Sequence, residues 1–469
     1  MDYTKTSKMV EEDFEKSIIP GLSEFVKRDN LSKSYDPEWN TNGKLEKACQ
    51  HLLNWSLAQG VKGMKGEMYK EEGRSPMLVL EIEPNSDSKK NILLYGHFDK
   101  QPHMLPWADG LHPTEPVIKD GYVYGRGSSD DGYSTFTIVE AIKVVQQNGG
   151  KHGKIIITIE GGEESGSPDL IYYLKKLGPR VGTPDLMVCM DSGCIDYESL
   201  WLTTSLRGVL VCDLTVEVLS ENVHSGSGSG ICADSFNIIR TLLDRLDDPS
   251  HTKMIDAFRV PIPNYMVEAA KKLGDLQKEK TVTEAVKLLE GVEAMDSDYA
   301  EVILNNTWRP TLTVTGMTGF PPAETAGNVL RDKTSCRISI RLPPTADAAK
   351  VAEITKKILE ENPPFNAKVK CEAKQFGYGW AAKDLCQVLK DSFSKSSQTL
   401  FGRDYYCLGE GGSIPFVYEL GDLFPTCELL VTGVLGPKTN AHCPNECLNL
   451  KYTEKMTTSL AHAIADYCA

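Results

Sequence analysis

The segment Asn-Ile-Leu-Leu-Tyr-Gly-His-Phe-Asp at residues 91–99 decides the fold. Residues 92–95 are an apolar run, which is typical of a short strand buried on both faces. Gly96 ends the run, so His97 and Asp99 fall in the turn at the carboxyl end of the strand. Ligands and catalytic groups gather at this end of the strands in an open α/β sheet. A histidine two residues before an aspartate is common by chance, so the pair gains meaning only from the rest of the chain.

Other segments repeat this strand pattern and alternate with amphipathic helices. Strand-like apolar runs occupy residues 77–82, 155–159 and 186–190, and helical spacing of apolar side chains marks residues 134–147 and 169–177. Strands that alternate with helices predict an α/β fold in which a mostly parallel, mixed sheet lies between layers of helices.

The pattern changes near residue 206. Residues 209–218 and 335–342 alternate apolar and polar side chains, as half-exposed antiparallel strands do. From Lys383 onward the first pattern resumes. We therefore predict one domain formed by residues 1–206 and 382–469, with an α+β domain inserted at residues 207–381. Residues 268–305 are polar and helical in pattern, which predicts an excursion on the surface of the inserted domain.

Composition restricts the class of protein. A chain of 469 residues with a net charge of −14 is unsuited to binding nucleic acid or an anionic membrane. Its 13 cysteines are scattered and include no C-x-x-C pair, a pattern that suits reduced thiols in a cytosol. The N-terminus lacks the pattern of a signal peptide, and no apolar run is long enough to span a bilayer. We expect a cytoplasmic protein.

Metal-ligand side chains recur at strand ends and in tight turns along the chain. They are His97, Asp130, Glu164, Asp191 and His442. Two imidazoles and three carboxylates suit zinc, with manganese as the alternative. Three carboxylates also nearly neutralise two dications, so a paired-metal site is expected, with one carboxylate bridging the ions and a shared water ionising near neutral pH.

The adjacent acids Glu163 and Glu164 point to a divided role. Two like charges side by side are costly unless one is bound to a metal and the other holds a proton part of the time. We expect Glu164 to bind metal, and Glu163 to take a proton from the attacking water and pass it to the leaving amine. Asp99 would orient His97 through its second ring nitrogen.

Each of these motifs also has an ordinary structural explanation. Asp130 and Asp131 lie in a glycine-rich turn, where aspartate is common, and Glu163 and Glu164 could cap the following helix. Cys443, beside His442, is expected to be a packed or exposed thiol rather than a ligand. Only their joint occurrence at matching strand ends favours a metal site. H-E-x-x-H, G-x-S-x-G and phosphate-loop motifs are missing from the sequence.

Five ordered motifs together resemble those of the M20 metallopeptidases, and most closely the branch of cytosolic non-specific dipeptidases and carnosinases. The motifs are Gly-His-Phe-Asp at 96–99, Gly-Arg-Gly-x-x-Asp-Asp at 125–131, Glu-Glu-Ser-Gly at 163–166, Asp191, and Ala-His at 441–442. The resemblance implies a zinc-exopeptidase-like catalytic domain, made of residues 1–206 and 382–469, and an inserted domain that acts as a lid and forms a homodimer.

The resemblance also implies roles for individual residues. Asp130 would bridge the two ions, with His97 and Asp191 on one metal, Glu164 and His442 on the other, and Glu163 as the general base. It further implies a cis peptide between Asp130 and Asp131. In the lid, His224 would reach the site of the partner subunit and stabilise the oxyanion. Three residues would bind substrate: Asn328, Arg341, which grips the carboxylate, and Ser413.

Two departures from the family pattern affect the substrate pocket. Where many relatives have Asp-Asp-Lys-Gly, this chain has Gly132 and Tyr133 after its two aspartates, so the lysine is missing. The histidine of a related His-Gly-x-x-Pro-Trp segment is missing at residues 375–380. These departures bear on side-chain preference and leave the metal ligands untouched.

The expected function is hydrolysis of the amide bond of dipeptides or short peptides with a free C-terminal carboxylate. A metal-bridging hydroxide would attack, with Glu163 as general base. The resemblance leaves an N-acyl-amino-acid deacylase of the same family as the alternative. A metal-binding scaffold without catalysis is a third class, although such a protein would be expected to lose the base or a ligand.

Overall fold

The computed structural model describes residues 1–248, 250, 253–412 and 415–469. They form two compact units. Unit 1 comprises Met1–Thr204, Ala382–Cys407 and Glu419–Ala469, and unit 2 comprises Ser205–Ala381 and Leu408–Tyr418. Unit 2 thus includes a stretch beyond the expected inserted segment. The stretch Leu408–Tyr418 belongs to unit 2 because the backbone N–H of Arg207 donates to the carbonyl of Glu410 at 3.3 Å. The local sequence pattern does not predict this pairing.

Unit 1 is built from a long mixed sheet with helices on both faces. Its strands are β1 (Met64–Tyr69), β2 (Met77–Ile82), β3 (Asn91–His97), β4 (Val117–Lys119), β5 (Tyr122–Tyr124), β6 (Lys154–Glu160), β7 (Leu186–Cys189), β17 (Glu428–Val431) and β18 (Cys447–Asn449). Its helices are α1 (Tyr3–Asp13), α2 (Ile19–Val26), α3 (Lys44–Ala58), α4 (Tyr133–Gln147), α5 (Leu170–Lys176), α6 (Gly178–Val181), α13 (Gln387–Phe401) and α15 (Leu450–Tyr467). Three elements span a boundary between the units: β8 (Trp201–Leu206), β16 (Tyr406–Glu410) and α14 (Pro415–Leu423).

In the long sheet these strands follow the order β1-β2-β6-β3-β7-β17-β8, while β4, β5 and β18 form a separate sheet in the order β18-β5-β4. At the centre, β3 pairs in parallel with β6 on one side and β7 on the other, with Leu94 opposite Ile157 and Val188. These strands are buried along almost their whole length because helices cover both faces of the sheet. The expected α/β fold with a mixed sheet is confirmed.

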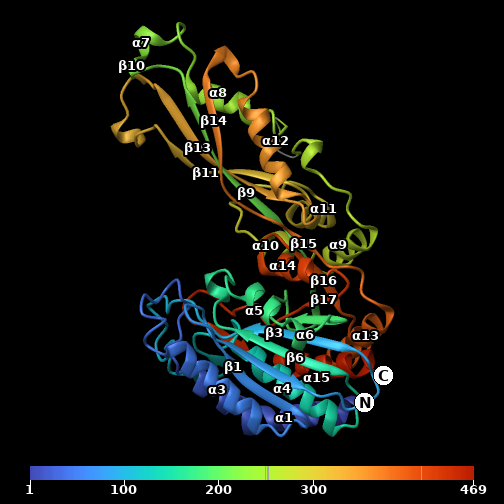
Figure 1. The fold of residues 1–469 in the computed structure, drawn as a ribbon. Helices are drawn as coiled ribbons and strands as arrows, with labels where there is room; N and C mark the ends of the chain where they lie inside the picture. The colour runs from blue at the N-terminus through green and yellow to red at the C-terminus, as the bar shows by residue number, and fades with distance from the viewer. Residues whose placement is uncertain (249, 251–252, 413–414) are drawn as a thin grey trace. The chain divides into compact units, whose positions relative to one another are not determined.

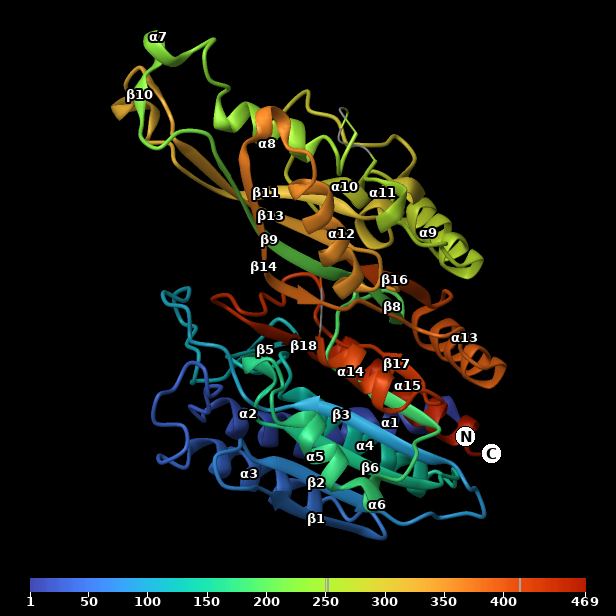
Figure 2. The same ribbon diagram turned by 45° about the horizontal axis from the view of Figure 1, so that its top comes forward.

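Chain direction explains why helices cover both faces. The connection from β3 to β6 runs through α4, and the connection from β6 back past β3 to β7 runs through α5 and α6. Parallel crossovers are right-handed, so two crossovers in opposite directions place their helices on opposite faces. Figures 1 and 2 show α4 and α15 on one face of the sheet, and α5 and α6 on the other. As a result, the carboxyl ends of β3, β6 and β7 meet at one edge.

Unit 2 is an antiparallel sheet covered by helices. Its strands are β9 (Gly208–Glu217), β10 (Val223–His224), β11 (Thr311–Thr318), β12 (Val329–Leu330), β13 (Lys333–Leu342), β14 (Lys368–Gly377) and β15 (Trp380–Ala381). Its helices are α7 (Ser225–Gly228), α8 (Ser235–Leu243), α9 (Asn264–Gln277), α10 (Lys280–Thr283), α11 (Tyr299–Thr307) and α12 (Ala348–Glu360). The main sheet has the order β11-β13-β9-β14, and alternate buried side chains of β9 and β13 form a core with α8 and α12.

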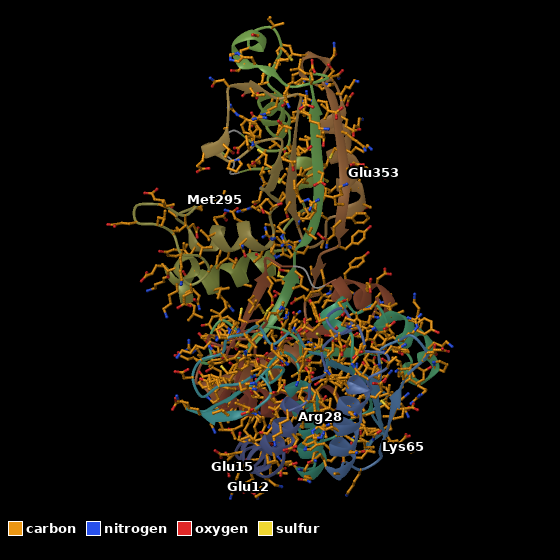
Figure 3. The ribbon with its side chains drawn as sticks, turned by 90° about the vertical axis from the view of Figure 1, so that its left-hand side faces the viewer. Glu12, Glu15, Arg28, Lys65, Met295 and Glu353 are labelled. Atoms are coloured by element: carbon orange, nitrogen blue, oxygen red, sulfur yellow. The ribbon has the colours of Figure 1, made fainter. Side chains whose placement is uncertain are left out.

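The excursion of unit 2 differs in part from the expectation. Helices α9, α10 and α11 are present, but residues 284–298 form no helix. Apolar side chains of this stretch are exposed, with Leu289 at 79% and Met295 at 63%, and Figure 3 shows Met295 on the outer loop of the excursion. Helical spacing alone does not make a stable helix when its apolar face has nothing to pack against. No helix among the described residues combines the length and apolarity that crossing a membrane requires.

Candidate active site

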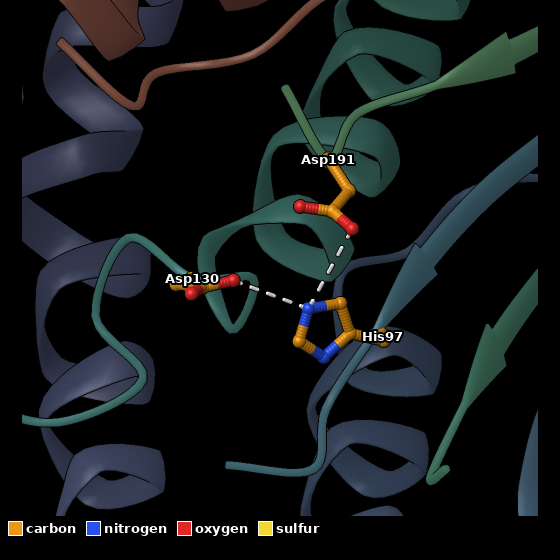
Figure 4. Close-up of side chains that lie close together, drawn as sticks. All are labelled: His97, Asp130 and Asp191. Atoms are coloured by element: carbon orange, nitrogen blue, oxygen red, sulfur yellow. Dashed lines mark hydrogen bonds and ion pairs between the residues drawn. The ribbon is translucent and has the colours of Figure 1, made fainter. Parts of the chain in front are cut away.

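Three elements of unit 1 bring His97, Asp130 and Asp191 together. His97 ends β3, Asp130 precedes α4, and Asp191 follows β7. The Nε2 atom of His97, which is fully buried, lies 3.3 Å from Oδ1 of Asp130 and 3.8 Å from Oδ2 of Asp191. Figure 4 shows both carboxylates directed at this one ring nitrogen.

A second group shares Asp130. The Nε2 atom of His442 lies 2.9 Å from Oδ2 of Asp130 and 3.3 Å from Oε2 of Glu164. Asp130 therefore turns one carboxylate oxygen toward each histidine. Two clusters with one shared carboxylate are the arrangement that a pair of bridged cations needs.

The donor atoms fit divalent cations. Among the residues that the structure describes, three sets of side chains hold their ligand atoms within 4.8 Å of one another: His97 with Asp130 and Asp191, His97 with Glu163 and Glu164, and Asp130 with Glu164 and His442. Imidazole nitrogens with carboxylate oxygens suit zinc and manganese. In addition, Oε1 of Glu164 is buried without a hydrogen-bond partner. A bound cation would satisfy this oxygen, whereas a buried, unpaired carboxylate oxygen is costly.

The histidines and Asp130 shift one another's pKa values. Hydrogen bonds to Asp130 and Glu164 raise the pKa of His442 to about 11. For His97, burial lowers the pKa, but hydrogen bonds to Asp130 and Asp99 outweigh burial and raise the pKa well above its usual value. Burial alone would raise the pKa of Asp130, but the two histidines hold it below its usual range. In the metal-free protein both imidazoles are therefore positively charged at neutral pH, where they compensate the carboxylates that a cation would otherwise neutralise.

Asp99 contacts both His97 and the segment that carries the paired glutamates. The Nδ1 atom of His97 lies 3.1 Å from the carbonyl oxygen of Asp99 and 3.4 Å from its carboxylate Oδ1. The carboxylate oxygens of Asp99 accept hydrogen bonds from the backbone N–H groups of Glu163 and Glu164, both at 3.1 Å. Asp99 therefore orients the ring of His97 and also fixes the turn after β6.

Glu163 lies beside the first cluster, with Oε2 at 3.9 Å from Nε2 of His97. Burial and the negative charge of Asp191 raise the pKa of Glu163 well above its usual value. A carboxyl group with a raised pKa can accept a proton and release it again near neutral pH.

Sequence patterns did not reveal two further contacts. The side-chain amide of Gln101 donates to Oε2 of Glu164 at 2.6 Å, and Oδ2 of Asp131 accepts from the backbone N–H of His97 at 3.0 Å. In the sequence, Asp131 stands out only as the second aspartate of the Asp130-Asp131 motif. No sequence feature indicates a role for Gln101. The expected cis peptide between Asp130 and Asp131 is present.

The remaining predicted residues belong to unit 2. His224 and Asn328 are both exposed. His224 ends β10, and Asn328 directly precedes β12, the strand that pairs with β10. The carbonyl of Asn328 accepts from the backbone N–H of Ser225 at 2.9 Å. Arg341 lies near the carboxyl end of β13. Its charge adds to the effect of burial in lowering the pKa of Arg207 to about 10. Ser413 lies outside the described residues.

A match to the model of peptidase family M20/M25/M40 covers residues 93–466. The chain belongs to this family and is a peptidase. The matched residues include all five expected metal ligands and Glu163.

Individual relatives agree with this family. The chain is 28% identical over 390 residues to the cysteinylglycine-S-conjugate dipeptidase of Corynebacterium striatum, covering 82% of each chain. It is 28% identical over 384 residues to the Cys-Gly metallodipeptidase DUG1 of Saccharomyces cerevisiae, covering 80% of this chain and 79% of that protein. The solved structure of human carnosine dipeptidase 1 has the same fold, with a TM-score of 0.70 at 18% identity over 99% of this chain and 98% of that one.

Proposed function

We propose that this peptidase is a dinuclear metal enzyme that cleaves dipeptides with a free C-terminal carboxylate. The observation that carries the proposal is the convergence of two histidines and three carboxylates around the shared Asp130, with Glu163 beside them. Two curated relatives are named dipeptidases, which supports the choice of short peptides as substrates.

Each proposed ligand has a place in this arrangement. Asp130 would supply a ligand to both cations, since its two oxygens lie near different histidines. His97 and Asp191 would hold one cation with it, and Glu164 and His442 would hold the other. Zinc is the expected metal and manganese the alternative, since both accept mixed imidazole and carboxylate ligands.

Cations held by these five residues would act as Lewis acids toward the substrate carbonyl and would lower the pKa of a water molecule toward neutrality. Glu163 accepts a proton from the attacking water. It then donates this proton to the amide nitrogen as the C–N bond breaks, so that the products are a carboxylate and a free amine. The raised pKa of Glu163 suits it to holding the proton between the two steps.

Arg341 is proposed to bind the C-terminal carboxylate of the substrate. Arg207 is 6% exposed, and its pKa is lowered in part by the charge of Arg341, so two guanidinium groups lie close enough to influence each other. Two cations held near each other favour an anionic group between them. A free carboxylate supplies this anion, and an amidated peptide does not.

Three further residues, His224, Asn328 and Ser413, are proposed to contribute to the site. The exposed pair His224 and Asn328 is proposed to complete the site of a partner subunit in a homodimer, with His224 stabilising the oxyanion. Ser413 is proposed to bind the substrate end that Arg341 binds.

A hydrolysis screen tests the proposal. The metal-free full-length chain is supplied with zinc or manganese and given Cys-Gly, β-Ala-His, other dipeptides, tripeptides, amidated dipeptides and N-acyl amino acids. We expect metal-dependent cleavage that is fastest for dipeptides with a free carboxylate. Faster cleavage of N-acyl amino acids than of dipeptides would show that the enzyme is a deacylase. Full activity in the presence of a chelator would contradict the metal mechanism.

A further inference from the structure

Glu446 is a buried carboxylate that binds the segment of the Asp130 loop. It has no exposed surface and lies four residues after His442. Its Oε1 atom accepts hydrogen bonds from the backbone N–H of Ser129, the hydroxyl of Ser129 and the backbone N–H of Asp130, each at 3.1 Å. Its Oε2 atom accepts from the backbone N–H of Gly127 at 3.1 Å and from Arg126 at 2.7 Å. All five donors come from residues 126–130.

Arg126 extends this contact in the other direction. Its guanidinium is 1% exposed, forms an ion pair with Glu446, and donates through Nη2 to the carbonyl of Cys443 at 3.0 Å. The pair therefore fastens residues 126–130 to residues 443–446. A buried ion pair gains little net stability over apolar side chains of the same size, because both charges lose their hydration. The stability of the fold alone therefore does not explain why Arg126 and Glu446 form a buried ion pair here.

The loop that carries His442 has a backbone that needs external support. Asn440, His442 and Asn445 all have positive φ angles, of 53°, 59° and 64°. Non-glycine residues rarely adopt this conformation, and they keep it only where surrounding contacts impose it. The hydrogen bonds of Arg126 and Glu446 lie at the centre and at the end of this loop and supply such contacts.

These contacts determine the relative position of two candidate ligands. Asp130 and His442 are more than 300 residues apart in the sequence, yet His442 Nε2 lies 2.9 Å from Oδ2 of Asp130. Glu446 binds the backbone N–H of Asp130 directly and belongs to the same loop as His442. It therefore connects the proposed bridging carboxylate to a histidine of the second cation position.

We propose that Glu446, together with Arg126, is a positioning residue that holds Asp130 and His442 at the separation at which both bind one divalent cation. This inference rests on the proposed function, because it assumes that these two side chains are metal ligands.

The test is Mn²⁺ binding by metal-free, full-length Glu446→Gln protein, followed by the EPR signal of free Mn²⁺. The substitution keeps the size of the side chain but places an amide N–H₂ group opposite backbone N–H donors and leaves Arg126 without its anion. Loss of contacts that orient ligands typically weakens metal binding about 10- to 100-fold, and we expect a loss of this size at one of the two Mn²⁺ positions. Excess Mn²⁺ should restore kcat, which it would not do for a misfolded protein.

Glu140→Gln is the matched control. Glu140 is also fully buried in unit 1, but it lies in α4 and pairs with Lys143 at 3.3 Å. It lies ten residues after Asp130 in the sequence and has no part in the contacts between residues 126–130 and 443–446 described above. Mn²⁺ binding should be unchanged in this variant.

The outcomes separate the inference from the proposed function. If the unaltered protein binds neither Mn²⁺ nor Zn²⁺, both fall, and if it binds Zn²⁺ alone, the same comparison of variants is made with Zn²⁺. If it binds two ions and Glu446→Gln binds them equally well, only the positioning role is overturned. Should Glu446→Gln fail to fold, Arg126→Met decides, because it removes the link to Cys443 and leaves the backbone hydrogen bonds of Glu446 in place. Unchanged Mn²⁺ affinity in that variant would overturn the inference, and weakened affinity would support it.

Discussion

Glu163 is the residue on which the proposed chemistry depends most. Its carboxylate lies 3.9 Å from His97 Nε2, and burial with the charge of Asp191 raises its pKa. Glu163→Ala should lower kcat by roughly 10²- to 10⁴-fold, the usual contribution of a general base. Both metal ions should remain bound, since His97, Asp130, Glu164, Asp191 and His442 are intact. Steady-state kinetics with metal analysis of the same sample checks this, and undiminished hydrolysis would remove the base assignment.

Metal binding should release protons because the ligands are protonated in the metal-free protein. The pKa of His442 is about 11 without metal, and that of His97 is also raised, so both imidazoles carry a proton at pH 7. A metal binds only the neutral ring, so affinity should fall as pH falls, and proton release should persist up to alkaline pH. Calorimetric titration with zinc in buffers of different ionisation enthalpy measures the protons released.

His442→Ala provides the comparison for this titration. We expect it to release about one proton fewer per chain, because one of the two charged imidazoles is gone. Equal proton release by both proteins would show that His442 is already neutral before the metal binds.

Arg341 should distinguish substrates by their C-terminal group. Losing a hydrogen bond to a charged group costs about 1.5–3 kcal/mol, so Arg341→Ala should lower kcat/KM for dipeptides roughly 10- to 100-fold and change amidated peptides little. Arg337→Ala is the control, since Arg337 lies on the same strand but pairs with Asp213 at 2.7 Å. Equal losses on both substrates would contradict the carboxylate contact.

At the scale of single residues, the sequence predicted side chains that stand at strand ends and missed those that act through tertiary contacts. His97 and Asp191 follow apolar runs, and this local signal was enough to group them. Gln101 contacts Glu164, and Glu446 contacts Asp130, across 63 and 316 residues respectively. A single sequence contains no signal for such partners, because nothing in the local pattern records what a polar side chain meets after folding.

Among the elements, strand β3 packs closely against the turn that carries Asp131, and Gly96 is the point of contact. A Cβ atom at this position would lie 2.6 Å from Oδ2 of Asp131 and would also overlap Ser134. Gly96→Ala should therefore destabilise the protein by about 1–3 kcal/mol, as overpacking does, and displace the carboxylate that accepts from the N–H of His97. Thermal unfolding and metal titration of the same variant measure both effects.

Gly178→Ala serves as the control for this substitution. A Cβ atom at Gly178, the first residue of α6, meets nothing within 4 Å, and its φ angle is not positive. The melting temperature and metal affinity should stay close to those of the unaltered protein. If Gly96→Ala also left the melting temperature and the metal affinity unchanged, the close packing between β3 and the turn that carries Asp131 would not affect the site.

Periodicity predicted the elements whose burial is strong and regular. The central strands β3, β6 and β7 and helix α4 were predicted within one or two residues. Strand β1 was missed because its exposed and half-buried residues, such as Lys65 and Glu67, show no clear apolar face. Strands β4 and β5 were missed because they are only three residues long, and the pairing of β5 with β18 joins segments that lie far apart in the chain.

For the whole molecule, the arrangement within unit 2 bears on how many subunits form one site. His224 and Asn328 lie beside β12, which precedes β13, whereas Arg341 lies near the carboxyl end of β13. Along a strand that rises about 3.3 Å per residue, Arg341 is roughly 25 Å from the start of β13. Side chains so far apart are too distant to contact the same dipeptide. If both act on substrate, they act on different substrate molecules, and His224 serves the site of a second chain.

Co-expression of Glu163→Ala and His224→Ala chains with different affinity tags tests this sharing. In the purified heterodimer, one site combines an intact Glu163 from one chain with an intact His224 from the other, and the second site lacks both. Because a two-fold dimer holds two equivalent sites, we expect about half of the unaltered turnover per dimer, while each variant alone stays nearly inactive. Sedimentation of the same sample establishes that it is a dimer. A heterodimer no more active than its parents would show that each chain uses its own His224 or needs none, and a monomer with full activity would exclude a shared site.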